Sequence, residues 1–266
     1  MTMPWRRSAR LDADAVDYFA RIAAAGGGLQ NGLYTERGTK RRLSDFFISL
    51  KDMGLWLSIS EMGIFLGVSS LPACLAKARY AAGTPSLLTN FNFVAGDHTP
   101  AGAASGLRGD GATKYLATGV DQASLSPGNL SQWAYVSNAV TSANTEALFG
   151  ANISPGVHLF KTLDTQFISA RTAQLVPTDS GFAITSGLIG YSRASSSLVN
   201  WQVGVNSGSS ASASASLASY PMTVLARGGA NPTQSTVALY GFGAAIDLVA
   251  LKTACDGVFA AFGGTP

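Results

Sequence analysis

Four aromatic side chains on predicted strands are the residues best suited to bind a small ligand. An aromatic face matches the apolar C–H face of a pyranose ring, so exposed tryptophan and tyrosine side chains can stack on sugars. On alternating strands, however, aromatic residues more often belong to the core. The candidates for sugar binding, on condition that they are exposed, are Trp133, Tyr135, Trp201 and Tyr240.

The residue types that catalysis requires show no recognisable arrangement. The sequence contains no Gly-x-Ser-x-Gly motif, which usually marks a nucleophilic serine. A glycosidase needs two carboxylates across a cleft, and acidic residues are sparse, without the alternating Glu-x-Asp-x-Glu strand of sandwich-fold glucanases. We therefore expect no catalytic residue, and we expect that the protein is not an enzyme.

Potential metal ligands are dispersed along the chain. The two histidines, His98 and His158, lie at ligand spacing from no other histidine or cysteine. Asp97, Asp110 and Asp121 fall in predicted loops, but they lack the dense spacing of a calcium-binding loop. We expect turn-forming aspartates, no metal and no cofactor.

The distribution of charge favours assembly over a free surface. Only 12% of the 266 residues are charged, and residues 175–243 hold three charged side chains. A free domain normally covers its outer face with Lys and Glu, whereas this stretch uses Ser, Ala, Gly, Thr and Asn. Such a surface suits a protein that packs against other copies, so we expect a homo-oligomer.

The basic excess belongs to the start of the chain. Residues 1–60 contain nine Lys and Arg against six Asp and Glu, whereas residues 101–266 contain seven of each. An electroneutral large domain argues against a nucleic-acid groove, so we favour an acidic protein partner for the basic segment. The candidate docking residues are Arg6, Arg7, Arg10, Lys40, Arg41 and Arg42.

Two short helices are predicted in the first 54 residues. Asp12 or Asp14 is predicted to cap the first helix. Ser44 is predicted to be the N-cap of the second helix, after a connector over residues 29–43. Residues 54–76 carry only one charge, which raises the question of a membrane span. Their glycines, Pro72 and serines instead favour a helix end that runs into a buried strand. The acidic residues that follow the basic start predict that no secretory signal is present.

From about residue 86 the pattern has the period of strands. Many short strands separated by Gly, Pro, Asn and Asp turns predict a mainly β fold, a jelly-roll (concanavalin/laminin-G-like) β-sandwich over 86–266. Residues 1–85 form a separate helical and extended docking segment. Residues 207–219 alternate Ser and Ala, which fits a strand or a partly ordered loop, with the loop favoured. Asp247 caps a C-terminal helix expected to cover its own sandwich.

The two cysteines, Cys74 and Cys255, lie far apart in the chain. A chain of this length needs no disulfide to fold, and Cys255 falls on the apolar face of the predicted C-terminal helix. Buried free thiols are expected.

Six short segments along the chain form a recognisable series. They are 12–15 (DADA), 50–56 (LKDMGLW), 109–119 (GDGATKYLATG), 130–136 (LSQWAYV), 148–151 (LFGA) and 239–247 (LYGFGAAID). In this order they resemble a group of tailed-phage virion proteins that carry concanavalin-like or laminin-G-like sandwiches. The resemblance carries over no catalytic or ligand residue, and it implies a structural or adhesive role.

The predicted function is a structural component of a tailed-phage or phage-like virion. Such a tail, fibre or head-attached accessory protein would mediate assembly and contact with the host surface. The alternative is a carbohydrate-binding module that recognises host surface glycan, and a third interpretation is a sandwich-fold glycan hydrolase or lyase. Expected partners are other virion proteins, copies of this chain and host glycan, with no nucleic acid; the expected location is the virion, assembled in the host cytoplasm.

Overall fold

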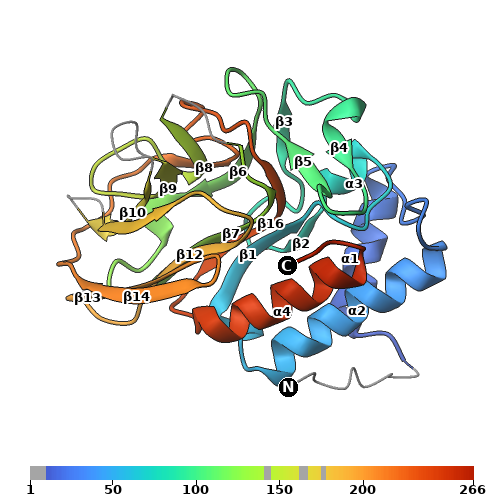
Figure 1. The fold of residues 1–266 in the computed structure, drawn as a ribbon, viewed down its shortest axis with the longest axis horizontal. Helices are drawn as coiled ribbons and strands as arrows, with labels where there is room; N and C mark the ends of the chain where they lie inside the picture. Colours follow the sequence, from blue (N-terminus) through green and yellow to red (C-terminus); the bar gives the residue numbers. More distant parts are fainter. Residues whose placement is uncertain (1–9, 141–144, 162–166, 175–177) are drawn as a thin grey trace.

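The protein is a β-sandwich with a layer of helices on one side (Figure 1). The structure is a computed structural model that describes residues 10–140, 145–161, 167–174 and 178–266. Within these residues, two antiparallel sheets contain sixteen strands, and few helices accompany them. The predicted mainly β sandwich with helices at both ends of the chain is therefore confirmed.

The nine-stranded sheet has the order β14-β13-β12-β7-β16-β1-β2, with β5 paired to β16 and β4 paired to β5. Its strands are β1 (Ile59–Ile64), β2 (Lys77–Arg79), β4 (His98–Thr99), β5 (Gly106–Arg108), β7 (Leu130–Asn138), β12 (Gly187–Arg193), β13 (Leu198–Val203), β14 (Asn206–Ala211) and β16 (Thr236–Gly243).

The second sheet has the order β11-β10-β9-β8-β15-β6-β3. Its strands are β3 (Thr89–Phe91), β6 (Tyr115–Asp121), β8 (Glu146–Gly150), β9 (Gly156–Lys161), β10 (Phe167–Gln174), β11 (Thr178–Ala183) and β15 (Pro221–Val224). The helices are α1 (Ala13–Ala24), α2 (Glu36–Asp52), α3 (Leu71–Leu75) and α4 (Leu248–Ala261), with short 3-10 turns at Trp56–Ser58, Ala95–Asp97 and Gln122–Ser124.

The C-terminal helix packs on its own sandwich, as predicted. The side chain of Asp247 accepts hydrogen bonds from the backbone N–H groups of Val249 and Ala250, which starts α4. The phenol of Tyr135 on β7 donates to Asp256 Oδ1 of α4 at 2.9 Å. Helix α4 lies across the nine-stranded sheet, and α2 runs beside it (Figure 1).

The first helix starts at the predicted cap, but the second starts earlier than predicted. Asp12 accepts from the N–H groups of Asp14 and Ala15. Thr35, not Ser44, caps α2, so residues 36–43 are helical rather than a connector. Ser44 lies buried in the middle of α2, where its hydroxyl accepts from the N–H of Asp12. A serine that looks like a helix cap thus joins two helices.

The N-terminal segment contributes strands to the sandwich. Strand β1 lies between β16 and β2 in the nine-stranded sheet, so residues 1–85 include two of its strands as well as α1 and α2. Five of the six residues of β1 are buried, which confirms that a helix end here runs into a buried strand. In the described part of the chain, no helix is long and apolar enough to cross a membrane.

The Ser–Ala tract divides into two parts. Residues 206–211 form β14, which pairs with β13 in a hairpin closed by Gly204 and Val205. Residues 212–220 have no strand or helix, although the N–H groups of Ser212 and Ser214 still donate to the chain before β13. The sequence left open a strand or a partly ordered loop, with the loop favoured; the structure has a strand over 206–211 and no regular secondary structure over 212–220.

Both thiols are buried and free, as predicted. Cys74 lies on α3 and Cys255 on α4. Burial raises the pKa of each thiol above its usual range, because a thiolate would lose its hydration there.

An ion pair lies between the two sheets, fully enclosed. Lys77 Nζ on β2 and Glu61 Oε2 on β1 are 2.7 Å apart, and the two side chains are 0% and 1% exposed. Tyr240 on β16 donates its hydroxyl to Glu61 Oε1 at 2.8 Å, and Lys77 also donates to the carbonyl of Thr118 on β6. Burial raises the pKa of Glu61 to about 7, although Lys77 and Tyr240 act in the opposite direction.

The approach of Tyr240 to β1 requires a glycine. A Cβ atom at Gly63 would lie 2.1 Å from the ring of Tyr240, so any side chain there would displace the ring. Because this ring carries the hydroxyl that binds Glu61, Gly63 is part of the same buried arrangement.

Removing one partner of the buried pair should be strongly destabilising. Lys77→Met leaves Glu61 without its cation, so we expect the free energy of unfolding at about pH 8, where the carboxyl group is mostly ionised, to fall by about 3–5 kcal/mol. Lys114→Met is the matched control, because the Lys114–Asp97 pair is 20% and 17% exposed and should be worth about 1 kcal/mol or less. Urea unfolding measures both; equal losses would contradict the role given to the buried pair.

The raised pKa of Glu61 predicts a pH dependence of stability. Between the ordinary value of 4.5 and about 7, the folded protein holds a proton that the unfolded chain releases, so stability should decrease as the pH rises through this range. Glu61→Gln should flatten that slope. Unfolding of both proteins at about pH 5 and about pH 8 tests this, and an unchanged slope in the variant would assign it to other groups.

Candidate functional site

Three of the four predicted sugar-binding aromatics are buried. The side chains of Trp133, Tyr135 and Tyr240 are 0% exposed, so the condition set for them is not met. Tyr135 packs against Phe259 of α4, and Tyr240 packs against Phe149 of the opposite sheet. These rings fill the layers on either side of the nine-stranded sheet, because alternation places them on its two covered faces.

Trp201 keeps part of its ring exposed. It lies on β13, near the open edge of the sandwich, with the ring of Phe182 on β11 5.7 Å away. Gly208 on β14 pairs with it, and a Cβ there would lie 2.5 Å from the indole. Trp201 therefore packs between the two sheets at their edge and is partly exposed.

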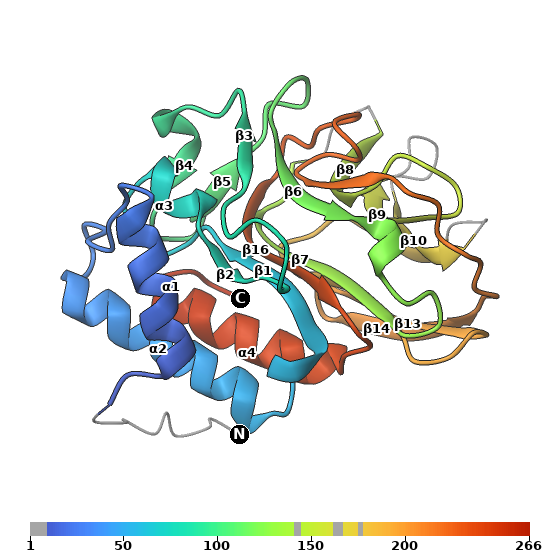
Figure 2. The same ribbon diagram turned by 180° about the vertical axis from the view of Figure 1, so that it is seen from behind.

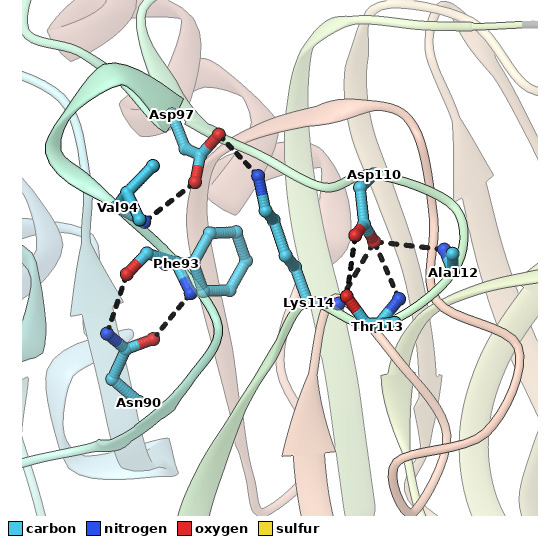
Figure 3. A network of polar contacts seen from close by, with 8 residues as sticks. All are labelled: Asn90, Phe93, Val94, Asp97, Asp110, Ala112, Thr113 and Lys114. Carbon is cyan, nitrogen blue, oxygen red and sulfur yellow. Dashed lines mark hydrogen bonds and ion pairs between the residues drawn. The ribbon is translucent and has the colours of Figure 1, made fainter.

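The three predicted loop aspartates form turns, as expected. Asp110 Oδ1 accepts from the N–H groups of Ala112, Thr113 and Lys114, at 2.8 to 3.0 Å (Figure 3). These hydrogen bonds hold the pKa of Asp110 well below its usual range. Asp97 pairs with Lys114 across the neighbouring loop, and Asp121 accepts from the backbone of Ala123 and Tyr220.

The histidines also serve local structure. His98 Nε2 lies 2.8 Å from the carbonyl oxygen of Phe65, and burial lowers its pKa. His158 Nδ1 lies 3.1 Å from the carbonyl oxygen of Ala151 inside the sandwich. Within the described ranges, no group of three His, Cys, Asp or Glu side chains is arranged to hold a metal ion.

A cleft of about 250 Å³ lies between α1 and β2. These two elements are neighbours on the helical side of the molecule (Figure 2). It combines two aromatic rings with two carboxylates and two guanidinium groups. We call it the α1–β2 cleft and define it by Asp14, Asp17, Arg21, Trp56, Ala78, Arg79 and Tyr80.

Helical spacing places the three residues from α1 on one wall. Asp14, Asp17 and Arg21 are separated by three and then four positions, so they share one face of the helix. The 3-10 turn after α2 supplies Trp56, and β2 with the residue after it supplies Arg79 and Tyr80.

The cations of the cleft are held in place by the backbone and by aromatic rings. Arg21 donates to the carbonyl oxygens of Lys77 and Ala78 at 3.1 and 3.0 Å. The guanidinium of Arg79 lies 4.5 Å from the ring centre of Trp56. Burial lowers the pKa of Arg79, while Asp14 opposes that shift. Among the described residues, Arg79 Nη1 is enclosed and has no hydrogen-bond partner.

The acidic side of the cleft is partly neutralised. Lys51 on α2 binds Asp14 Oδ2 at 2.5 Å and Asp12 Oδ2 at 2.8 Å. Asp17 is exposed, as is Tyr80 at 38%. The cleft thus offers an exposed carboxylate and an exposed ring to a polar ligand, beside two guanidinium groups.

Sequence analysis did not single out this cleft. Its residues are scattered over positions 14–80, and only their tertiary arrangement brings α1 beside β2. The one available signal was the polar spacing of Asp14, Asp17 and Arg21 on a helix whose other face is apolar.

The predicted docking residues are in different situations. Arg10 and Arg41 are exposed, and Lys40 pairs with Glu36 at 2.6 Å. Arg42 is bound into the fold, because it donates to the carbonyl oxygen of Ala261 and lies 3.5 Å from the ring centre of Tyr34. Arg6 and Arg7 lie outside the described residues.

Comparison with known proteins gives distant structural similarity only. No family model and no curated protein matches the chain. Domain 4 of a GH43 extracellular arabinanase from Geobacillus stearothermophilus, in complex with arabinotriose, is 12% identical with a TM-score of 0.41, over 77% of this chain and 98% of that domain.

Two further structures are similar. A prokaryotic β-1,3-1,4-glucanase (lichenase) from a mouse hindgut metagenome is 11% identical with a TM-score of 0.29, over 50% of this chain and 70% of that one. Trypanosoma rangeli sialidase is 10% identical with a TM-score of 0.36, over 85% of this chain and 40% of that one. None of the three is described as a phage protein.

The prediction that this protein is not an enzyme is wrong as an exclusion, because the similar structures include an arabinanase domain, a glucanase and a sialidase. The physical reason is that a sandwich can assemble a site from residues on separate strands and loops, without a contiguous motif. At this similarity, the neighbours assign no activity to this chain.

The turn-forming role of Asp110 is testable. Asp110→Ala removes the acceptor for three backbone N–H groups, so the free energy of unfolding should fall by about 1 kcal/mol. Thermal unfolding with and without added Ca²⁺ should show no stabilisation of the unaltered protein. A rise in Tm with Ca²⁺ that Asp110→Ala abolishes would identify a cation site instead.

Proposed function

We propose that this protein binds a carbohydrate in the α1–β2 cleft. The observation that carries the proposal is the combination, in one cleft, of the rings of Trp56 and Tyr80 with carboxylate and guanidinium groups. Aromatic faces can cover the C–H face of a sugar, and planar charged groups can bind pairs of neighbouring hydroxyls. A small number of placed polar groups beside apolar surface is typical of ligand sites.

The side chains of the cleft divide these tasks. Tyr80 is the exposed ring, while the ring of Trp56 is partly covered by Arg79 and lies 5.0 Å from Phe47. The exposed carboxylate of Asp17 supplies acceptors for hydroxyl groups, and the guanidinium groups of Arg21 and Arg79 line the cleft beside it. Lys51 holds Asp14 in place from the other side.

Replacing the exposed ring should weaken binding without unfolding the protein. Tyr80→Ala should weaken binding to glycans found on a glycan array by about tenfold, the loss of roughly one stacking contact. Phe182→Ala is the matched control, because Phe182 is 39% exposed against 38% for Tyr80 but lies at the edge of the sandwich. Equal binding by Tyr80→Ala and the unaltered protein would refute the site.

Substituting the exposed carboxylate of the cleft distinguishes a binding site from a hydrolytic site. Asp17→Asn keeps the shape of an exposed side chain while removing its charge. The array glycans that bind are also assayed for release of reducing sugar. Binding without release makes the cleft a binding site, whereas release that Asp17→Asn abolishes makes it a hydrolytic one.

We also propose a structural role in a tailed-phage or phage-like virion, with glycan binding as its contact to a host surface. The sequence resemblance supports this proposal, together with the lack of charged side chains from residue 194 to 226. These residues include the edge strand β14, where natural proteins usually place charges that discourage pairing with another chain. Copurification with virion components, and its absence for an unrelated sandwich, would test the proposal.

A further inference from the structure

Strand β14 forms one end of the nine-stranded sheet and has an open edge. It pairs with β13 on one side, and in the described part of the chain no other strand pairs with its second side. Figure 1 shows the hairpin of β13 and β14 at the end of the molecule away from α1. An open edge presents a row of backbone N–H and C=O groups with which another strand can pair.

The other sheet edges are protected in ways that β14 is not. At the β2 edge, Arg21 of α1 donates to the carbonyl oxygens of Lys77 and Ala78. Strand β3 has only three residues, and β11 carries Asp179. Short edge strands, charged side chains and covering elements all discourage pairing with another chain. Strand β14 has six residues and contains neither a charged residue nor a proline.

The register of the hairpin determines which backbone groups point to the open edge. Val203 lies opposite Asn206, and the two residues between them form the turn. A turn of two residues makes this closing pair hydrogen-bonded, and along an antiparallel ladder such pairs alternate with pairs whose N–H and C=O groups point outward. The residues of β14 with outward groups are therefore Ser207, Ser209 and Ala211, and all three are exposed.

The side chains of β14 favour an identical strand over an unrelated peptide. A peptide added to a sheet edge gains its specificity from pockets that receive its alternate side chains. Strand β14 offers Asn, Ser, Gly and Ala instead, and the ring of Trp201 fills the space over Gly208, where a Cβ would lie 2.5 Å from the indole. A second β14 brings equally small, uncharged side chains, so no like charges would oppose each other.

Antiparallel pairing of two identical strands is self-complementary about a two-fold axis. With the axis at Ser209, each Ser207 lies opposite Ala211 of the other copy, so the outward groups of one strand all face those of the other. The exposed apolar surface near this edge supports the same contact. Val205 at the tip of the hairpin is 86% exposed, and Phe182, which lies 5.7 Å from Trp201, is 39% exposed.

We infer that two copies of this chain pair through β14, antiparallel about a two-fold axis at Ser209, so that the nine-stranded sheet continues from one copy into the other. The α1–β2 clefts then lie at the two far ends of the joined sheet, because β2 and β14 are its opposite ends. The inference does not rest on either proposed function, since it concerns a contact of the chain with itself.

Sedimentation velocity of the full chain over a wide range of protein concentration tests the pairing. The unaltered protein should form a dimer as the concentration rises. Ser209→Lys places two like charges opposite each other, so it should raise the dissociation constant of the dimer by about tenfold or more. Ala104→Lys adds the same charge at an exposed position of the loop before β5 and should leave the dissociation constant unchanged.

Two further substitutions test the backbone contact and its register. Ser209→Pro removes an outward N–H but no hydrogen bond to β13, so it should give a folded monomer whose Tm no longer depends on protein concentration. Because Cys74 and Cys255 are buried, Ser209→Cys should add the one accessible thiol and form a disulfide-linked dimer on oxidation. Ala104→Cys is its control and should not be linked to a comparable extent.

Four results would overturn the inference. They are a monomer at every concentration, a dimer that Ser209→Lys and Ser209→Pro leave intact, an equal loss of dimer in Ala104→Lys, and no disulfide in Ser209→Cys beyond that of its control. Binding on the glycan array is expected to be the same for Ser209→Lys and the unaltered protein, so failure of the pairing and failure of the proposed sugar site are distinguishable.

Discussion

The enclosed ion pair between Glu61 and Lys77 constrains the whole architecture. Two charges without water are stable only when each has its partner and its remaining hydrogen bonds, so β1, β2, β16 and β6 must all be in place together. The pair joins two strands from the first third of the chain to the last strand of their sheet and to the opposite sheet. Displacing β2 would leave a carboxylate buried alone.

The same constraint positions the α1–β2 cleft. Because the side chain of Lys77 is fixed inside, the next residues of β2 run along the edge of the sheet towards α1. Arg21 of α1 donates to the backbone of Lys77 and Ala78, so helix and strand are joined directly beside the buried charge. The outer surface at this edge then carries Arg79 and Tyr80 next to Trp56. The α1–β2 cleft thus lies directly beside the buried ion pair.

The α1–β2 cleft and the charge-free hairpin of β13 and β14 lie at opposite ends of the nine-stranded sheet. The cleft, beside β2, combines aromatic rings with charges of both signs. The hairpin forms the other end of the sheet and carries no charged side chain. The two surfaces are therefore separated by the full width of the sheet.

Sequence periodicity determined the fold class, the C-terminal helix with its Asp247 cap, the buried thiols and the turn-forming aspartates, because each depends on neighbours within a few positions. The start of α2 was misplaced because Ser44 has the local properties of a cap, and only the contact with Asp12 shows its role. Whether an aromatic residue of a strand is core or surface depends on what covers that face, so Trp133, Tyr135 and Tyr240 could be assigned only once α4 and the second sheet were placed. The α1–β2 cleft and the pairing of Glu61 with Lys77 likewise join residues far apart in sequence, and their distances are set by tertiary packing alone.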